Sequence, residues 1–266
     1  DTFAEKVAAT ADKIVVGARR DDDNGNRSGS AYVYDINDLS ATPTKLTAFD
    51  GAADDEFGIS VATTDDKIIV GASGDESSTG SVYVYDANDL SAQPTKLTAF
   101  DGAAGDNFGI SIATAADKII VGANQTNDNG TNSGSVYVYD ANDLSATPTK
   151  LTAFDGEMND QFGVNVHVSA DYIFVCGQNN TRGVYVYDAN TYSYIRNLVP
   201  DGLAFDDLFG LSVSTNEDNV FISAMGDDDN GSNSGSVYVY DANDLSATPT
   251  KLTAFDGAAS DRFGHS

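Results

Sequence analysis

The chain has 266 residues, of which 41 are acidic and 14 basic, and its formal net charge is -27. Such a surface repels phosphate backbones and anionic lipid headgroups, so we expect neither nucleic-acid binding nor binding at a membrane surface. No apolar run approaches the roughly 18 residues that span a bilayer, so direct membrane insertion is not expected either. The acidic balance suits salty or calcium-containing surroundings.

Cys176 is the only cysteine, so the chain can form no internal disulfide. It stands in an apolar run, 172–176, and we interpret it as a small buried residue that replaces the alanine found at that point in other repeats. The sequence opens within a repeat, at Asp1-Thr2-Phe3, from which we expect a mature or trimmed product.

A phenylalanine-centred signal, [DN]-x-F-G, recurs along the whole chain at intervals of 47 to 54 residues. Its phenylalanines are Phe3, Phe57, Phe108, Phe162, Phe209 and Phe263, the first of which precedes Ala4 instead of a glycine. A nearly verbatim block, S-V-Y-V-Y-D-A-N-D-L-S-A-x-P-T-K-L-T-A-F-D-G, occupies 81–102, 135–156 and 236–257. We therefore predict a single domain, 1–266, divided into repeats 1–54, 55–105, 106–159, 160–206 and 207–260.

Each repeat is predicted to contain four short strands, which are clearest in the second repeat. In chain order they are 57–63, 67–72, 81–85 and 95–100, each rich in β-branched or aromatic residues and bounded by turn formers. Apolar residues show no sustained helical period. Four strands per repeat of about 50 residues predict an all-β fold, a β-propeller of four-stranded antiparallel blades, over the rival solenoid of stacked sheets.

The number of blades depends on the last six residues. Residues 261–266 begin a further repeat, or form a closure seam beside residues 1–4. We favour five blades, with six or seven if the chain is part of a longer ring.

The repeat resembles the FG-GAP repeat, especially its short bacterial and algal form. The resemblance rests on F-G-I-S-V-A at 57–62, K-I-I-V-G-A at 67–72, G-S-V-Y-V-Y at 80–85 and G-D-D-D-N-G-S-N-S-G-S at 226–236. It implies a propeller like the integrin α-subunit head, found in cell-surface, secreted and adhesive proteins. Integrin-type calcium loops lie between the first and second strands, where this chain has only a short connection at 64–66, so those sites are not carried over.

Three acidic loops lie instead between the second and third predicted strands of the first, third and fifth repeats. Clustered carboxylates, an Asn carbonyl and a tight glycine turn suit calcium, a hard cation that prefers oxygen ligands. The EF-hand register fails, however, and Asn-Gly also forms an ordinary solvated hairpin turn, so both interpretations stay open. The candidate metal ligands are Asp21, Asp22, Asp23, Asn24, Asn127, Asp128, Asn129, Asp227, Asp228, Asp229 and Asn230.

Other side chains recur in every repeat, which favours structural roles over five separate active sites. The D-G aspartates and the aspartates two places before the phenylalanine are expected to brace loops by accepting backbone N–H groups. The tyrosine pairs spaced two residues apart are expected to pack between blades, although sugar stacking is the alternative. The aspartates are Asp50, Asp101, Asp155, Asp201 and Asp256 in the first set, and Asp55, Asp106, Asp160, Asp207 and Asp261 in the second.

The fourth repeat departs furthest from the common block, since 190–198 reads N-T-Y-S-Y-I-R-N-L. Such drift indicates either relaxed constraint or a surface where another protein binds. Tyr192, Tyr194 and Arg196 are residue types enriched among interface anchors, so they are the candidate partner-binding residues.

We predict no catalytic residue. His167 and His265 are the only histidines, and neither belongs to a Ser/His/Asp or His-x-x-His pattern. A hydrolase based on carboxylates is less favoured because no unique acid pair stands out from the repeated ones.

We expect a non-enzymatic binding or adhesion module at an extracellular, cell-surface or virion-surface location. It would engage protein or glycan through the propeller loops, with calcium as its one candidate cofactor. The alternative is a structural or decorating propeller of a larger assembly, such as a virion appendage or a surface filament.

Overall fold

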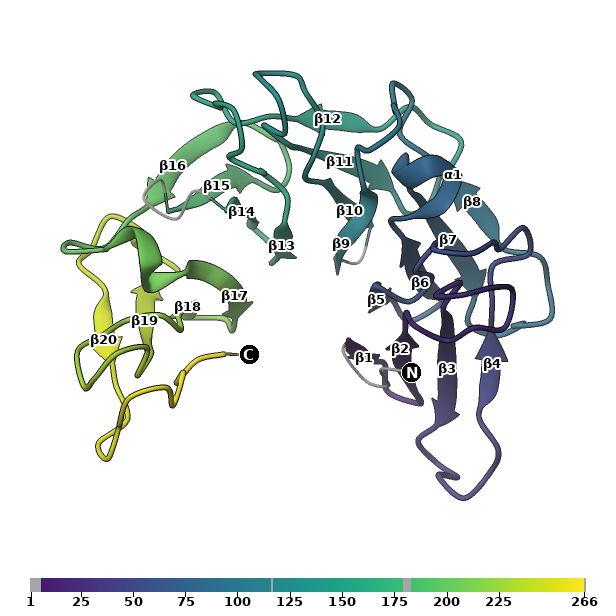
Figure 1. Cartoon of the computed structure of the whole chain (residues 1–266), viewed down its shortest axis with the longest axis horizontal. Coiled ribbons are helices and arrows are strands. Elements are labelled where there is room, and N and C mark those ends of the chain that lie inside the picture. The colour runs from purple at the N-terminus through teal and green to yellow at the C-terminus, as the bar shows by residue number, and fades with distance from the viewer. Residues whose placement is uncertain (1–5, 116, 179–182, 266) are drawn as a thin grey trace.

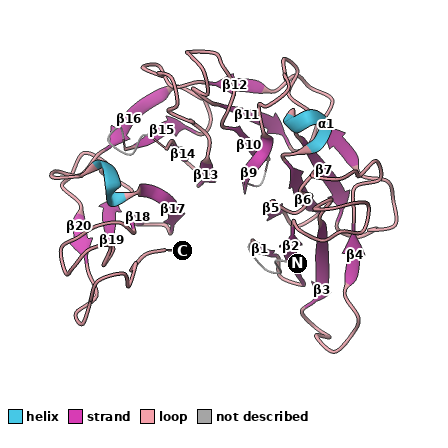
Figure 2. Ribbon diagram, viewed as in Figure 1, coloured by secondary structure: helices cyan, strands magenta, loops and turns pink. Residues whose placement is uncertain are grey.

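The computed structural model describes residues 6–115, 117–178 and 183–265, which form five sheets of four antiparallel strands. Each sheet consists of four strands that are consecutive in the chain, and each strand pairs with the next one. Strands and loops account for nearly all of the fold (Figure 2). The predicted all-β architecture of four-stranded antiparallel blades is confirmed.

The first sheet contains β1 (Val7–Ala9), β2 (Lys13–Ala18), β3 (Ser30–Asp35) and β4 (Thr44–Leu46). The second contains β5 (Ser60–Thr63), β6 (Lys67–Ala72), β7 (Ser81–Asp86) and β8 (Thr95–Leu97). The third contains β9 (Phe108–Ala115), β10 (Lys118–Ala123), β11 (Ser135–Asp140) and β12 (Thr149–Leu151). The fourth contains β13 (Asn165–Val168), β14 (Tyr172–Cys176), β15 (Val184–Asp188) and β16 (Tyr194–Leu198). The fifth contains β17 (Phe209–Thr215), β18 (Asn219–Ala224), β19 (Ser236–Asp241) and β20 (Thr250–Leu252). Two short helical elements, α1 (Asp75–Ser78) and η2 (Phe205–Asp207), interrupt loops of the described chain.

The five sheets follow one another along an arc, as the blades of a propeller do (Figure 1). The first strands, such as β5, β9 and β13, lie on the inner side, and the fourth strands, such as β8 and β12, lie on the outer side. The chain thus forms the five blades predicted. The arc is open between the fifth sheet and the first, and β1 and the described residues after β20 lie beside this open side. Residues 1–5, which include Phe3 and the N-terminal part of the predicted seam, lie outside the described residues, as does Ser266.

The second strand of each of the three middle blades is buried on both faces because it lies between two neighbouring sheets. In β6, Ile68 and Val70 belong to the apolar cluster shared with the first sheet, whereas Ile69 belongs to the cluster shared with the third sheet. All three side chains are fully buried. Side chains alternate between the faces of a strand, so a doubly covered strand must be apolar, as I-I-V-G-A at 68–72 is.

Each pair of adjacent sheets shares one apolar cluster. Between the second and third sheets, the preceding sheet contributes Val82, Val84 and Leu97, and the following sheet contributes Phe108 and Tyr137. The rings of Phe108 and Tyr137 meet edge to face with centroids 5.4 Å apart. This packing confirms the prediction that the tyrosine pairs lie between blades.

Cys176 occupies a position that is glycine, not alanine, in the first three blades. It pairs across the sheet with Asn165 and Val184, just as Gly122 pairs with Ser111 and Val136. The alanine assignment was wrong because a glycine follows one residue later, at Gly177, and shifts the apparent alignment. The expected burial is confirmed, and it raises the pKa of the Cys176 thiol to about 12.

Candidate functional site

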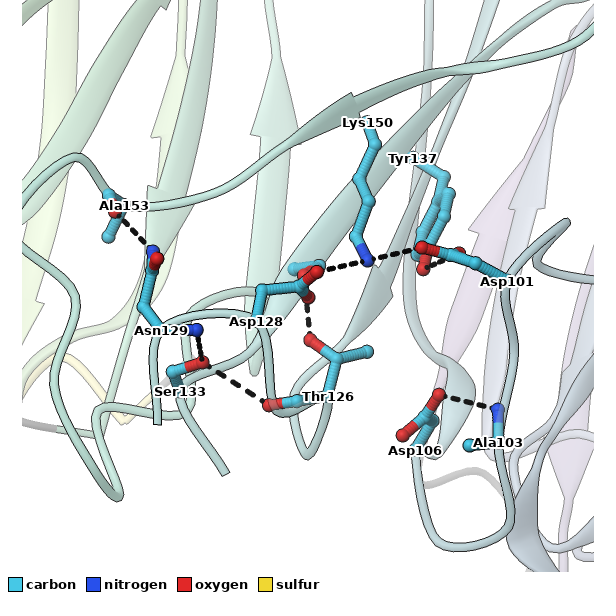
Figure 3. Close-up of polar contacts among 11 residues, drawn as sticks. Asp101, Ala103, Asp106, Thr126, Asp128, Asn129, Ser133, Tyr137, Lys150 and Ala153 are labelled. Atoms are coloured by element: carbon cyan, nitrogen blue, oxygen red, sulfur yellow. Dashed lines mark hydrogen bonds and ion pairs between the residues drawn. The ribbon is translucent and has the colours of Figure 1, made fainter. Parts of the chain in front are cut away.

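The loops between second and third strands lie beside the linkers that join successive blades, and lysine side chains connect the two. In the third blade, Lys150 Nζ lies 2.7 Å from a carboxylate oxygen of Asp101 in the linker and 2.7 Å from one of Asp128 in the acidic loop (Figure 3). The Tyr137 hydroxyl donates to Asp101 at 2.7 Å, and Lys150 Nζ stands 5.3 Å from the centre of the Tyr137 ring. We call this arrangement a lysine cluster.

The lysine cluster recurs because the fourth strand carries the sequence T-K-L in four of the five blades. In the second blade, Lys96 contacts Asp50 and Asp75, each at 2.7 Å. In the fifth and first blades the lysine pairs instead with two carboxylates of the acidic loop, Lys251 with Asp227 and Asp229, and Lys45 with Asp21 and Asp23. The fourth blade differs, since Asn197 stands opposite Tyr185 where Lys150 stands opposite Tyr137.

Mutual pairing keeps these groups charged. Burial by itself would raise the pKa of Asp101 and Asp128, but hydrogen bonds from Lys150 and from neighbouring hydroxyls, together with the positive charge of Lys150, outweigh it, and the pKa of both carboxyls is lowered. Burial would likewise lower the pKa of Lys150, but its hydrogen bonds to the two carboxylates outweigh that and raise its pKa. At neutral pH the cluster therefore contains one ammonium between two carboxylates.

The remaining residues of the acidic loops hold the loops in shape. The Asn127 side-chain oxygen accepts the backbone N–H of Asn132 at 2.9 Å, and the Asn129 amide donates to the carbonyl of Ala153 at 2.8 Å (Figure 3). Asp22 and Asp228 accept backbone N–H groups across their own loops, at 2.8 and 2.6 Å. Asn230 donates to Ala254 at 3.1 Å, while the backbone N–H of Asn24 donates to the hydroxyl of Ser28 at 2.9 Å.

The eleven candidate metal ligands thus fall into three separate loops, each with internal partners. Within the residues that the structure describes, no group of three or more His, Cys, Asp or Glu side chains is arranged to hold a metal ion. Where two carboxylates of a loop converge, as at Asp227 and Asp229, the ammonium of Lys251 lies between them. The residues as arranged fit a lysine, and a calcium ion would have to displace it. Calcium binding stays a prediction.

The aspartates two places before the phenylalanine act as the predicted loop braces. Asp106 accepts the backbone N–H of Ala103 at 2.8 Å, and the same bond recurs in the other linkers at 2.6 to 2.8 Å. Burial raises the pKa of Asp106, and the backbone hydrogen bond partly offsets it. The residues that brace the other linkers are Asp55, Asp160, Asp207 and Asp261.

The three candidate partner-binding residues lie in different surroundings. Tyr194 is 39% exposed on β16, whereas Tyr192 packs against the apolar cluster between the third and fourth blades. Hydrogen bonding from the Ser246 hydroxyl is the main cause that lowers the pKa of Asp244, a residue of the fifth blade. The positive charge of Arg196 also lowers this pKa, so Arg196 lies toward the fifth blade. Only Tyr194 of the three therefore presents an exposed apolar surface.

Sequence reasoning missed the partner of Tyr194, which is Phe154. The two rings lie 4.6 Å apart between centroids, and Phe154 is 67% exposed. The signal was present in the recurring T-A-F-D-G string, whose phenylalanine is exposed in every blade that contains it. These phenylalanines are Phe49, Phe100, Phe154 and Phe255.

The FG-GAP repeat family matches residues 1–34, 42–85, 92–139 and 192–240, more than half of the chain. The chain belongs to the FG-GAP repeat family. No curated protein matches it significantly. FG-GAP propellers are typically non-enzymatic and occur in extracellular and surface proteins. No helix in the described parts of this FG-GAP chain is long and apolar enough to cross a membrane. The longest unmatched stretch, 140–191, includes β13 to β15 of the divergent fourth blade.

Proposed function

We propose that this FG-GAP propeller is a non-enzymatic, extracellular or surface-exposed adhesion module that binds a protein partner at the fourth blade. The exposed ring pair of Phe154 and Tyr194 carries the proposal, because two large aromatic side chains in contact remain accessible to solvent. Rigid aromatic anchors of this kind dominate the energetics of protein interfaces. Exposed apolar patches on soluble proteins commonly mark such interfaces.

The fourth blade and its linkers carry further exposed apolar side chains. Ile195 follows Tyr194 on β16 and is exposed, as are Met158 in the preceding linker and Val199 just after the strand. Aliphatic and thioether groups favour a protein partner, since sugars bind through aromatic faces together with polar groups.

The inner surface of the arc supports a non-enzymatic role. A hollow of about 300 Å³ there is lined by residues of β5 and β9, such as Ser60, Ile110 and Ser111, with Arg19 and Lys6 at one side. Its described lining includes no acid, histidine or cysteine, and the hydroxyls of Ser60 and Ser111 donate to backbone carbonyls of Gly109 and Gly163 rather than to a base.

The test is a binding screen against arrays of purified secreted and cell-surface proteins and of defined glycans. A Phe154→Ala, Tyr194→Ala double variant should lose at least about 30-fold in affinity for a protein hit, which corresponds to about 2 kcal/mol. Phe100→Ala is the matched control, because Phe100 occupies the same motif position, is 58% exposed and should be neutral.

An equal loss in the Phe100→Ala control, or unchanged binding by the double variant, would contradict the assignment of the surface. Binding to the glycan array alone would indicate that the protein binds sugars instead. Absence of binding on both arrays would favour the alternative, a structural propeller of a larger assembly.

Calcium assistance is tested separately by calorimetric titration of calcium into chelator-treated protein, with thermal melting alongside. Saturable heat and a raised melting temperature would make the acidic loops metal sites. In that case Lys150→Met should bind calcium more tightly than the unaltered chain, because the competing ammonium is gone. Absence of both heat and shift would leave the loops as lysine-paired turns.

A further inference from the structure

Every junction between neighbouring blades is built from the same two surfaces. The leading surface of the preceding blade consists of two small apolar residues of the third strand, both valine except for Ala31 in the first blade, and a leucine of the fourth strand. Val136, Val138 and Leu151 are an example. The trailing surface of the following blade supplies the phenylalanine of the repeat signal and the tyrosine pair, such as Phe162 and Tyr185. The chain contains four such junctions, one for each pair of adjacent sheets.

The fifth blade carries a complete leading surface that nothing in the described chain covers. Val237 and Val239 on β19 are half-buried, whereas their counterparts in the other blades are buried. Leu252 on β20 is 43% exposed, compared with 7% for Leu151. The surface faces the open side of the arc (Figure 1). It continues an interface that the chain builds four times internally.

The linker beyond β20 is already folded as a blade junction. The backbone N–H of Phe263 donates to the carbonyl of Ser234 at 2.9 Å, just as that of Phe162 donates to Ser133 at 2.9 Å. Asp261 braces this linker through the backbone N–H of Ala258. Yet Phe263 is 38% exposed, whereas Phe162 is completely buried against its tyrosine pair. The phenylalanine is in position, and the tyrosines that would cover it are not among the described residues.

Hydrogen-bond acceptors for such tyrosines are also in place. At the junction of the second and third blades, Tyr137 donates to the carboxylate of Asp101 and Tyr139 donates to the carbonyl of Thr98. The equivalent groups after β20 are Asp256 and the carbonyl of Thr253, by their positions in the repeated T-A-F-D-G string. A Tyr-x-Tyr strand would thus meet two acceptors as well as an apolar surface.

We propose that the leading surface of the fifth blade, formed by Val237, Val239 and Leu252 together with Phe263, is a docking surface for one further four-stranded blade of this repeat type. The occupant carries Tyr-x-Tyr on its third strand and a lysine on its fourth. The tyrosines cover Phe263, and the lysine pairs with Asp256 as Lys150 pairs with Asp101.

A second copy of the chain is a poorer fit than a single blade. Its first blade offers a matching pair, Tyr32 and Tyr34, both half-buried. The rest of that copy, however, would have to share the open side of the arc with the first sheet of the first copy (Figure 1). A single blade has the required surface without this crowding.

The experiment appends one blade to the full chain by placing a copy of residues 112–156 directly after Ser266. Residues 263–266, which align with 108–111 of the third blade, then form the beginning of the first strand of the appended blade. A Leu252→Cys variant reports on the surface, because the native Cys176 is buried and its thiol pKa is raised, so it reacts slowly with thiol reagents. Docking should slow labelling of the new cysteine at least tenfold and raise the melting temperature. The matched control carries Tyr137→Ser and Tyr139→Ser in the appended copy alone, and it should label as rapidly as the chain without the appended blade.

Equal labelling rates with and without the appended blade would overturn the proposal, as would full protection by the tyrosine-free control. Sedimentation of the chain without the appended blade gives the remaining outcome. Self-association that protects the new cysteine and disappears on dilution would assign the surface to a second copy instead. The docking surface would be established if the chain without the appended blade is a monomer, if its new cysteine is reactive, and if only the appended blade with intact tyrosines protects that cysteine.

Discussion

Gly122 in β10 has no room for a side chain, because the next blade approaches its Cα directly. An added Cβ would lie less than 3.0 Å from the carbonyl oxygen of Gly163 and from the hydroxyl oxygen of Ser111. Those two atoms form a buried hydrogen bond of 2.8 Å that joins the third and fourth blades. Gly122→Ala therefore forces the blades apart at the inner edge of the junction.

The expected cost combines three effects. Overpacking of a well-packed interior costs about 1 to 3 kcal/mol. Weakening the bond between Ser111 and Gly163 adds about 1 kcal/mol. The lower entropy of the unfolded alanine chain offsets about 0.5 kcal/mol, since the backbone of Gly122 is not at positive φ. A net loss of about 1.5 to 3.5 kcal/mol lowers the melting temperature by about 3 to 14 °C for a chain of this size.

Differential scanning calorimetry measures this shift, and Cys176→Ala is the matched control. Cys176 occupies the equivalent position in β14, where the next blade already accommodates a side chain. Removing its sulfur should cost only about 1 kcal/mol, similar to one buried methylene. A melting temperature for Gly122→Ala within about 2 °C of the unaltered chain, or a larger drop for Cys176→Ala, would refute the close-approach argument.

Two further predictions concern the lysine cluster of the third blade. Tyr137→Phe removes the 2.7 Å bond to Asp101 but keeps the ring, so the free energy of unfolding in a urea titration should fall by about 1 kcal/mol; no change would contradict a role for the hydroxyl. The pKa of Asp101 and Asp128 is lowered on folding, so their contribution to stability is present above pH 4 and is lost as the pH falls below the unfolded value of 3.8. Lys150→Met should therefore melt with a weaker dependence on pH below 4 than the unaltered chain, and parallel curves would contradict this linkage.

The sequence predicts the blades well because each depends on signals repeated within about 50 residues. The alternation of apolar side chains and the turn formers around 67–72 act locally, and Asp106 reaches a backbone group only three residues away. Because the repeat is duplicated, the same local pattern occurs several times in the sequence, and each copy supports the same prediction. For this reason the braces and the packing of the tyrosine pairs could be predicted with the fold.

The lysine clusters could not be predicted in the same way, because their members are distant in sequence. Lys150 meets Asp128 from 22 residues away and Asp101 from 49 residues away. An acidic loop by itself resembles a metal-ion site. Only the fold shows that the cation beside its carboxylates is the ammonium of a lysine from the same chain. The T-K-L string contained the signal, since its lysine is present in four blades and absent from the fourth.

The loss of that lysine and the exposed ring pair occur in the same blade, and this coincidence favours an external role for the fourth blade. In the other blades, the lysine of the T-K-L strand pairs with a carboxylate of the loop between the second and third strands, so these residues already have internal partners. In the fourth blade, Asn197 replaces the lysine, and Tyr194 on the same strand stacks on Phe154 at the surface. Relaxed constraint alone accounts for the loss of the lysine, whereas Tyr194 adds a second large aromatic ring that contacts Tyr187 and Phe154 and still remains 39% exposed. A surface selected to bind another protein accounts for both changes.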